Sequence, residues 1–364
     1  MNRVHIRVQP RPYEAIVENG LLERSGACLR AVLGGHPRLF VVTVAPVRRK
    51  WGKKLIRSLE AGGFVTRTLE MPDGERAKQL STVEQLAEKM SRLGADRNAV
   101  VVAFGGGVVG DVAGLLSSLY MRGVDLVQVP TTVVAQVDAS IGGKTGVNLK
   151  AGKNLLGTFH QPRAVLIDPE VVSTLPDREF RAGLYEALKC GVIGDPQLFR
   201  RFEDEKDKIL ERDPDALQAI IAESMKLKAE IVSADERESG LRRVLNFGHT
   251  IGHALEAETG YRGLLHGEAV GWGMIAASNI ALAMHKVDSL TAGRIADGVL
   301  GLGGLPRLEV KTRNLVSRLR ADKKTVDGMV HFVLPTEIGK VEVVSGVPQK
   351  LVLEAIDELR HLSD

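Results

Sequence analysis

Cysteine, aromatic residues and long apolar runs are all scarce in this chain. Its two cysteines, Cys28 and Cys190, cannot build a disulfide framework, which favours a reducing compartment. Aromatic residues amount to 4%, too few to interleave with the basic residues as nucleic-acid binding requires, although the net charge is +4. No run reaches the roughly 18 apolar residues of a membrane helix, and residues 1–10 lack the apolar segment of a signal peptide. We therefore expect a cytoplasmic protein that binds neither nucleic acid nor membrane.

The rest of the composition is that of an ordinary globular protein. Apolar residues make up 44% of the chain and charged residues 26%, which argues against disorder and against a fibrous repeat. A length of 364 residues exceeds the size at which single hydrophobic cores stop growing. We expect two domains, residues 1–175 and 176–364, with the boundary at Leu175-Pro176.

The first half alternates between strand-like and helix-like segments. Short apolar runs rich in β-branched residues predict buried parallel strands, and longer runs with helical spacing lie between them. This alternation predicts a Rossmann-like α/β domain with a parallel sheet that binds its ligand beyond the carboxyl ends of the strands. The predicted strands are 39–44, 99–104, 124–129 and 164–167, and the predicted helices are 47–60, 80–93 and 109–120.

The second half has mainly helical periodicity. One short hairpin is predicted around Ile338-Gly339, from residues 330–334 and 341–344. The second domain is therefore expected to be mainly α-helical. Its predicted helices are 178–193, 216–235, 249–259, 267–285 and 351–362.

A glycine-rich turn follows the second predicted strand. Gly105, Gly107 and Gly110 have the spacing of a dinucleotide-binding turn and lead into a helix. Such glycines let the backbone approach a pyrophosphate at a helix N-terminus. The pattern lies on a middle strand, and a structural tight turn explains it equally well.

The segment Pro130–Asn154 is polar, basic and rich in glycine. It is too polar for a core and too patterned for a linker, so we expect a loop shaped around an anionic ligand. Within it, Asp138 to Thr145 resembles a phosphate-binding loop but has Asp138 where the first glycine belongs, which argues against an ATPase. Lys144, between glycine and threonine, suits a phosphate or carboxylate, or is a solvated surface lysine.

Metal-binding residue types gather in the second half. His249 and His253 are four residues apart on one helical face, a spacing that can bind zinc, and His266 follows after the next turn. Glu186 and Lys189 lie one turn apart on another predicted helix. One carboxylate with two imidazoles would leave coordination positions open, as in catalytic zinc sites. The spacing does not decide which two histidines bind the metal.

A charged segment leads into the histidine pair. Lys228 precedes a run of charges that ends at Arg242 and Asn246. Such a run is usually a solvated helix face. The turn expected at residues 246–248 would instead let Arg242 and Asn246 face a ligand.

In these motifs the chain closely resembles the 3-dehydroquinate synthase family of sugar-phosphate cyclases, over nearly its whole length. The resemblance implies an NAD domain and a helical metal and substrate domain, assembled as a homodimer. The motifs that carry it are residues 72–75 with Lys78, 105–111, 121–123, 130–154, 175–176, Glu186 with Lys189, 228–242, 245–253, 266–268 and 322–324.

The resemblance also implies roles for individual residues. Zinc, or Co²⁺ in its place, would be bound by Glu186, His249 and His266, which frees His253 for acid-base work. Catalytic roles are implied for His253, Lys144, Lys189, Asp138 and Asn246. Substrate contacts are implied for Arg122, Asn154, Lys228, Arg242 and Lys324, with Lys323 as the alternative to Lys324. NAD contacts are implied for Glu75, Lys78, Gly106, Gly107, Asp111, Thr131, Thr132, Lys153 and Thr174.

The reaction that the resemblance implies belongs to the shikimate pathway. The substrate is 3-deoxy-D-arabino-heptulosonate 7-phosphate, and the products are 3-dehydroquinate and phosphate. NAD would oxidise one ring hydroxyl transiently, phosphate would be eliminated, the hydride would return, and ring opening with an aldol step would close the carbocycle. One departure concerns the cofactor. The family commonly has Asp and Asn after the first strand, whereas this chain has Val44-Ala45-Pro46 with Arg48 and Arg49 nearby, which leaves NADP open.

Three other functions fit parts of the pattern. A cyclase acting on a different sugar phosphate would share most motifs, although a guanidinium such as that of Arg242 favours a carboxylated substrate. A metal-dependent alcohol or polyol dehydrogenase would share the two-domain plan and would accumulate reduced cofactor. A non-catalytic sugar-phosphate sensor would show no turnover.

Overall fold

The structure of the chain is a computed structural model that describes residues 2–35, 37–260, 262–310, 314–315, 318–319 and 330–363. It divides into two compact units. The first comprises residues 1–175 and 217–237, and the second comprises residues 176–216 and 238–364. The division at Leu175-Pro176 lies where the sequence changes from alternating strands and helices to helices. The segment 217–237 groups with the first unit although the chain has by then entered the second.

The described part of the first unit is built on a seven-stranded sheet with the order β1-β2-β9-β6-β5-β3-β4. All neighbouring strands from β2 to β4 in this order are parallel, and β1 and β2 form an antiparallel hairpin. The strands are β1 (Asn2–Ile6), β2 (Tyr13–Val17), β3 (Arg38–Val44), β4 (Val65–Met71), β5 (Val100–Gly105), β6 (Asp125–Pro130) and β9 (Ala164–Ile167). The order reverses between β3 and β5, and their carboxyl ends are therefore where such a sheet binds its ligand.

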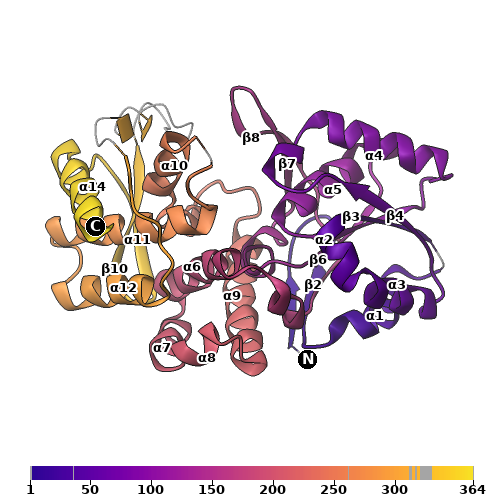
Figure 1. Ribbon diagram of the computed structural model, residues 1–364, viewed down its shortest axis with the longest axis horizontal. Helices are drawn as coiled ribbons and strands as arrows, with labels where there is room; N and C mark the ends of the chain where they lie inside the picture. The colour runs from indigo at the N-terminus through magenta and orange to yellow at the C-terminus, as the bar shows by residue number, and fades with distance from the viewer. Residues whose placement is uncertain are drawn as a thin grey trace. The chain divides into compact units, whose positions relative to one another are not determined.

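Helices cover both faces of this sheet, with α4 and α5 on one face and α1 and α3 on the other (Figure 1). The helix α9 belongs here through contacts such as that with the turn after β2, where the Gln218 side chain accepts a hydrogen bond from the backbone N–H of Asn19 at 2.8 Å. The helical segments of the unit are η1 (Leu21–Arg24), α1 (Ser25–Leu33), α2 (Ala45–Val47), η2 (Arg48–Gly52), α3 (Lys53–Ala61), η3 (Glu75–Ala77), α4 (Leu80–Arg92), α5 (Gly107–Leu119), η4 (Tyr120–Arg122), η5 (Ala135–Ala139), η6 (Pro169–Thr174) and most of α9 (Pro214–Ala234).

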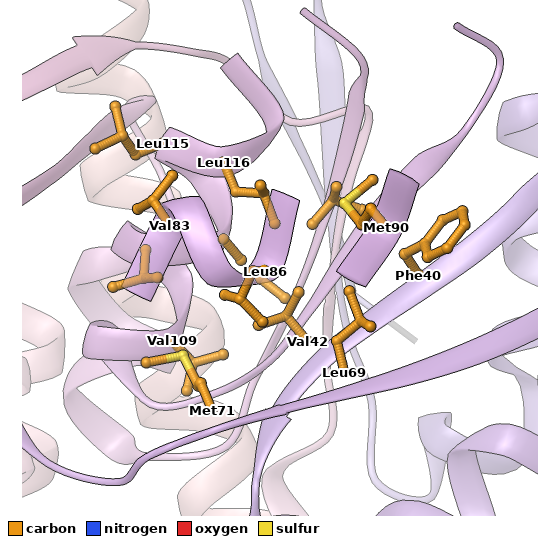
Figure 2. Packing of buried hydrophobic residues seen from close by; sticks show 14 of the residues in the cluster. Phe40, Val42, Leu69, Met71, Val83, Leu86, Met90, Val109, Leu115 and Leu116 are labelled. Carbon is orange, nitrogen blue, oxygen red and sulfur yellow. The ribbon is translucent and has the colours of Figure 1, made fainter. Parts of the chain in front are cut away.

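The core between the sheet and α4 and α5 follows from the two-residue period of the strands. Phe40 and Val42 of β3 point to this face, where Leu86 and Met90 of α4 meet them (Figure 2). These side chains are fully or almost fully buried. The residues between them on β3 face the opposite layer, so both faces of the strand are buried and its sequence is almost continuously apolar.

The polar segment after β6 is more ordered than expected. It contains η5 and the strand β7 (Lys144–Leu149), which pairs antiparallel with β8 (Gly152–Phe159). The expectation of one long loop is therefore wrong for these residues. The glycines serve close strand pairing, since a Cβ at Gly157 would lie 2.0 Å from the carbonyl oxygen of Thr145. A strand, not a helix, follows Lys144, so the segment lacks the architecture of an ATP-binding phosphate loop.

The second unit is mainly helical, as expected, with one described hairpin of β10 (His331–Glu337) and β11 (Lys340–Ser345). Helix α11 is buried along most of its length. It packs against α6, α10, α12 and α14. The helical segments are α6 (Asp177–Gly194), α7 (Pro196–Asp204), α8 (Lys206–Leu210), η7 (Leu241–Asn246), α10 (His249–Glu258), α11 (His266–Ala283), α12 (Ser289–Gly301) and α14 (Gln349–Ser363). Among the described residues, no helix combines the length and apolarity that crossing a bilayer requires.

The core of the first unit generates a stability prediction. Replacing Leu86, 1% exposed, by Ala removes a side chain from the cluster on α4 and should cost about 2–5 kcal/mol of unfolding free energy. The same change at Leu80, 48% exposed on the same helix, should cost far less. Chemical denaturation of both variants measures the difference, and equal losses would mean that this cluster does not stabilise the unit.

Candidate active site

The glycine turn lies at the reversal point of the sheet. Gly105 ends β5, Gly106 precedes α5, and Gly107 begins it, so backbone N–H groups of the first turn are available to a ligand. The turn is constrained by its neighbours: a Cβ at Gly106 would lie 3.0 Å from Cγ2 of Thr132. The sequence-predicted arrangement of strand, glycine turn and helix is present.

The segment after β6 flanks this turn. The backbone N–H of Thr131 donates to the carbonyl of Gly105 at 2.9 Å. The hydroxyl of Thr131 is buried and has no hydrogen-bond partner among the described residues. Because a buried hydroxyl without a partner is costly, its placement beside the glycine turn fits a polar ligand there. The fully buried side chain of Gln136 donates to the carbonyls of Pro130 and Asp168, joining the segments that follow β6 and β9.

The loop before α4 joins the same edge of the sheet. The ammonium of Lys78, 6% exposed, contacts the carboxylate of Asp111 on α5. The side chain of Asn148 on β7 donates to Glu75 at 2.7 Å, and its backbone N–H donates to the carbonyl of Lys78 at 2.9 Å. Three residues predicted to bind the cofactor are thus brought together. Asn148 was not among the predicted site residues, because its role is to hold this loop and not to carry charge.

A second ion pair in the first unit links two residues assigned to substrate and catalysis. The ammonium of Lys228 on α9 lies 2.6 Å from the Asp138 carboxylate on η5, and Lys228 is 4% exposed. Ninety residues separate the two in sequence. The grouping of α9 with the first unit is what brings them together.

The other predicted residues of the first unit lie on turns and on the β7–β8 hairpin. Thr174 ends η6 and its hydroxyl accepts a hydrogen bond from the indole N–H of Trp51 at 2.9 Å. Lys144 begins β7 and is exposed. Lys153 and Asn154 lie at the start of β8, where Asn154 has a φ of 55°. Arg122, with a φ of 69°, is exposed at the end of η4.

In the second unit, glycines allow three helices to approach at backbone distance. A Cβ at Gly267, the second residue of α11, would lie 1.7 Å from the carbonyl oxygen of Ala182 on α6. A Cβ at Gly273 of α11 would lie 1.8 Å from the carbonyl oxygen of Gly248, which precedes α10 with a φ of 76°. Only glycine fits such contacts. They bring the start of α11 against α6 and α10.

The result is a cluster of one carboxylate and three imidazoles. Oε1 of Glu186, on α6, lies 3.6 Å from Nε2 of His249 and 3.2 Å from Nε2 of His266. The ring centroids of the three histidines are 5.2 to 5.8 Å apart. The ammonium of Lys189, one turn along α6, lies 2.6 Å from the other Glu186 oxygen. All five residues predicted for this cluster are together.

The charges in the cluster favour an ionised carboxylate. Burial alone would raise the pKa of Glu186, but the Lys189 ammonium and the His266 imidazole outweigh it and hold that pKa well below its usual range. Burial would likewise lower the pKa of His266, whereas the carboxylates of Glu186 and Glu256 raise it to about 10. A divalent cation would take the place of that proton.

Two sets of three side chains have their ligand atoms within 4.8 Å of one another: Glu186, His249 and His266, and also His253, Glu256 and His266. Both oxygens of Glu186 are buried and accept no hydrogen bond of good geometry from the described residues. These lone pairs fit metal coordination and favour the first set. Glu256 was not among the predicted site residues, although an acid three residues after His253 on the same helix was a usable signal.

The remaining predicted residues of the second unit are only partly placed. Arg242 is 2% exposed on η7. Asn246, at the end of η7, donates from its side chain to Glu238 at 2.9 Å. The turn expected at residues 246–248 is present and leads into α10. Lys323 and Lys324 lie outside the residues that the structure describes.

Comparison with known proteins identifies the family. A model of the 3-dehydroquinate synthase N-terminal region matches residues 68–182, and a model of the C-terminal region matches residues 183–325. The chain belongs to the 3-dehydroquinate synthase family. It is 55% identical to the 3-dehydroquinate synthase of Koribacter versatilis over 100% of this chain and 99% of that protein. It is 49% identical to that of Solibacter usitatus over 96% and 97% of the two chains.

Solved structures of other sugar-phosphate cyclases have the same fold. The structure of 2-epi-5-epi-valiolone synthase from Streptomyces hygroscopicus with NAD⁺ and Zn²⁺ bound matches with a TM-score of 0.89 at 31% identity, over 98% of both chains. That of 2-deoxy-scyllo-inosose synthase with carbaglucose-6-phosphate, NAD⁺ and Co²⁺ matches with a TM-score of 0.88 at 27% identity, over 98% and 99%. An iron-containing alcohol dehydrogenase, at 15% identity and a TM-score of 0.68, shares the fold alone. The predicted fold class is confirmed.

The two candidate metal sets predict different mutational outcomes. If Glu186, His249 and His266 bind the ion, Glu186→Gln and His249→Ala should each weaken binding of a divalent ion by more than the roughly 10–100-fold that loss of an outer-shell partner costs. His253→Ala should retain the ion. The metal content of each dialysed variant shows whether the ion is retained, and titration with a chelator measures its affinity.

Glu179→Gln is the control for these variants, because Glu179 is exposed on the same helix as Glu186. Full metal content in Glu186→Gln together with its loss in His253→Ala would assign the ion to the other set.

Proposed function

We propose that the chain catalyses the 3-dehydroquinate synthase reaction, converting 3-deoxy-D-arabino-heptulosonate 7-phosphate to 3-dehydroquinate and phosphate. The single observation that carries the proposal is the convergence of Glu186, His249 and His266 in a chain of this family. In enzyme-class terms it is a phosphate-eliminating carbon–oxygen lyase that depends on NAD and a divalent metal. The biosynthetic role of its relatives and its two cysteines favour the cytoplasm.

The metal set supports this chemistry through its donors. Two neutral imidazoles and one carboxylate suit Zn²⁺, or Co²⁺, and three protein ligands leave room for substrate oxygens. When bound, the metal supplies Lewis-acid polarisation of the substrate oxygens, and NAD supplies transient redox chemistry. Lys189 keeps the Glu186 carboxylate ionised for this role. His253, whose ring centroid is 5.4 Å from that of His249, is the imidazole of the cluster outside this set and would be left to exchange a proton or hydrogen bond with a substrate hydroxyl.

The cations support a substrate with a phosphate and a carboxylate. Lys228 is buried but held by Asp138, which fixes the ammonium without leaving an unpaired buried charge. We assign Arg122, Lys144, Asn154, Arg242 and Asn246 to the same substrate, because guanidinium, ammonium and amide donors suit its oxygens. Lys324 completes the assignment from the family pattern.

The glycine turn and its neighbours are assigned to NAD. Gly106 and Gly107 expose backbone N–H groups to the pyrophosphate at the N-terminus of α5. The guanidinium of Arg48 forms an ion pair with the Glu70 carboxylate at 2.5 Å. This pairing competes with binding of the 2′-phosphate of NADP. We therefore propose NAD over NADP. Further contacts are assigned to Glu75, Lys78, Asp111, Thr131, Thr132, Lys153 and Thr174, and the active form is proposed to be a homodimer.

An assay separates this function from its rivals. Purified protein given the heptulosonate phosphate, NAD and Zn²⁺ should release one phosphate per substrate consumed while the absorbance of reduced cofactor stays flat, because the hydride is returned. Steady accumulation of reduced cofactor would indicate a dehydrogenase. Phosphate release only from a different sugar phosphate, with none from this one, would indicate another cyclase, such as the synthases with which it shares its fold.

A second prediction tests the cofactor turn. Gly107→Ala should fold normally, because the added methyl would lie 3.5 Å from Ala139 in ordinary contact. It should nonetheless weaken NAD binding at least about tenfold, because a side chain at the first residue of α5 would crowd a pyrophosphate held by the backbone N–H groups of this turn. Titration of NAD by calorimetry measures the affinity. Gly293→Ala on α12, where no atom lies within 4 Å, is the control, and equal affinities of the two variants would remove Gly107 from the cofactor site.

A further inference from the structure

Glu256 is a buried carboxylate beside the metal cluster that has no part in the proposed reaction. It lies on α10, one turn after His253, and its side chain is 5% exposed. Its Oε2 lies 3.1 Å from Nδ1 of His266. A buried carboxylate is costly unless it is paired, and the contact with this ring helps to compensate that cost.

The contact fixes which ring nitrogen of His266 faces Glu186. An ionised carboxylate only accepts hydrogen bonds, so Nδ1 of His266 carries a hydrogen, and Nε2 is the ring nitrogen left to bind an ion. That Nε2 lies 3.2 Å from Oε1 of Glu186. His249 is arranged in the same way, since its Nδ1 lies 3.0 Å from the carbonyl oxygen of Phe247 and its Nε2 faces the same Glu186 oxygen. Both rings thus turn Nε2 toward one point.

The alternative is that Glu256 is itself a ligand, together with His253 and His266. An ion bound there through Nδ1 of His266 would remove the hydrogen that Glu256 accepts. It would also leave Oε1 of Glu186, which is buried, faces both His249 and His266, and accepts no well-formed hydrogen bond from the described residues, without an ion to coordinate. An ion at Glu186, His249 and His266 satisfies those oxygens and keeps the Glu256 contact. Binding by Glu186, His249 and His266 therefore accounts for more of the buried polar groups.

We propose that Glu256 is a positioning residue of the metal site: its carboxylate holds His266 with Nδ1 bearing the hydrogen and presents Nε2 to the ion bound by Glu186 and His249. The inference rests on the proposed function for the identity of that ion. Carboxylates that orient a ligating histidine in this way typically change metal affinity by about 10–100-fold when they are lost.

The test compares three variants of the full chain. Glu256→Ala removes the acceptor, and Glu256→Gln keeps the shape but offers a neutral amide, which can turn its NH₂ toward the ring and favour the wrong tautomer. Glu258→Gln is the control: it lies on the same helix, is 15% exposed and accepts a hydrogen bond from Asn314 at 2.6 Å, away from the histidines. Zn²⁺ affinity is measured by competition with a chelator, and thermal unfolding is measured with and without Zn²⁺.

We expect Glu256→Ala to bind Zn²⁺ about 10–100-fold more weakly than wild type and Glu256→Gln to lie between the two, with a weakening larger than any loss of metal-free stability accounts for. Glu258→Gln should bind like wild type. Wild-type affinity in Glu256→Ala would overturn the proposal, as would a loss of metal-free stability that accounts for the whole effect. Complete loss of the ion in Glu256→Gln with retention in Glu186→Gln would show Glu256 to be a ligand. A wild-type protein that binds Zn²⁺ but releases no phosphate would instead refute the proposed function.

Discussion

The second unit depends on one constraint, the approach of α6, α10 and α11 at backbone distance. Gly267 and Gly273 of α11 touch backbone carbonyls of the two other helices, where any side chain would overlap them. These contacts place Glu186, His249 and His266 around one point although they come from three helices. The Glu186 carboxylate is nearly inaccessible there, at 1% exposure, so its charge must be balanced locally. Lys189 balances the charge at one Glu186 oxygen, and the other oxygen faces the two imidazoles, where a divalent cation would bind.

In the first unit the corresponding constraint is the common direction of the parallel strands. β3, β5, β6 and β9 end at one edge, so the segments that follow them become neighbours without long loops. Hydrogen bonds then tie these segments together. Gln136 links the turns after β6 and β9, and Asn148 links the hairpin to the loop before α4. These hydrogen bonds connect the segments at the edge where a cofactor would bind. The buried hydroxyl of Thr131 lies at the same edge, and a polar cofactor could form a hydrogen bond with it.

The sequence predicted much of this because the relevant signals are local. β3 and β5 are buried on both faces, so their sequences are almost continuously apolar and rich in β-branched residues. Such runs are easily recognised as strands. The pair His249 and His253 reveals itself by spacing on one helix. The hairpin of β7 and β8 was missed because glycines and hydroxyl residues, which usually mark loops, serve here to let two strands approach closely. The grouping of α9 with the first unit also had no local signal, because a helix at residues 214–234 shows its periodicity but not its partner.

Glu256 illustrates the limit most sharply. On α10 it is one of two acids, and its spacing of three residues from His253 places it on the histidine face without showing that it is enclosed there. Its importance comes from burial, which only tertiary packing decides. Glu258 stays accessible enough to pair with Asn314, whereas Glu256 is enclosed with its oxygen against His266. A solvated carboxylate would contribute little to holding a histidine ring, because water screens the interaction. Glu256 and Glu258 have the same functional group, so the difference between them lies in desolvation. Residues that contact the ligands of a metal site, but not the metal, are therefore the part of the site that sequence patterns predict least. Their effect depends on burial by tertiary packing.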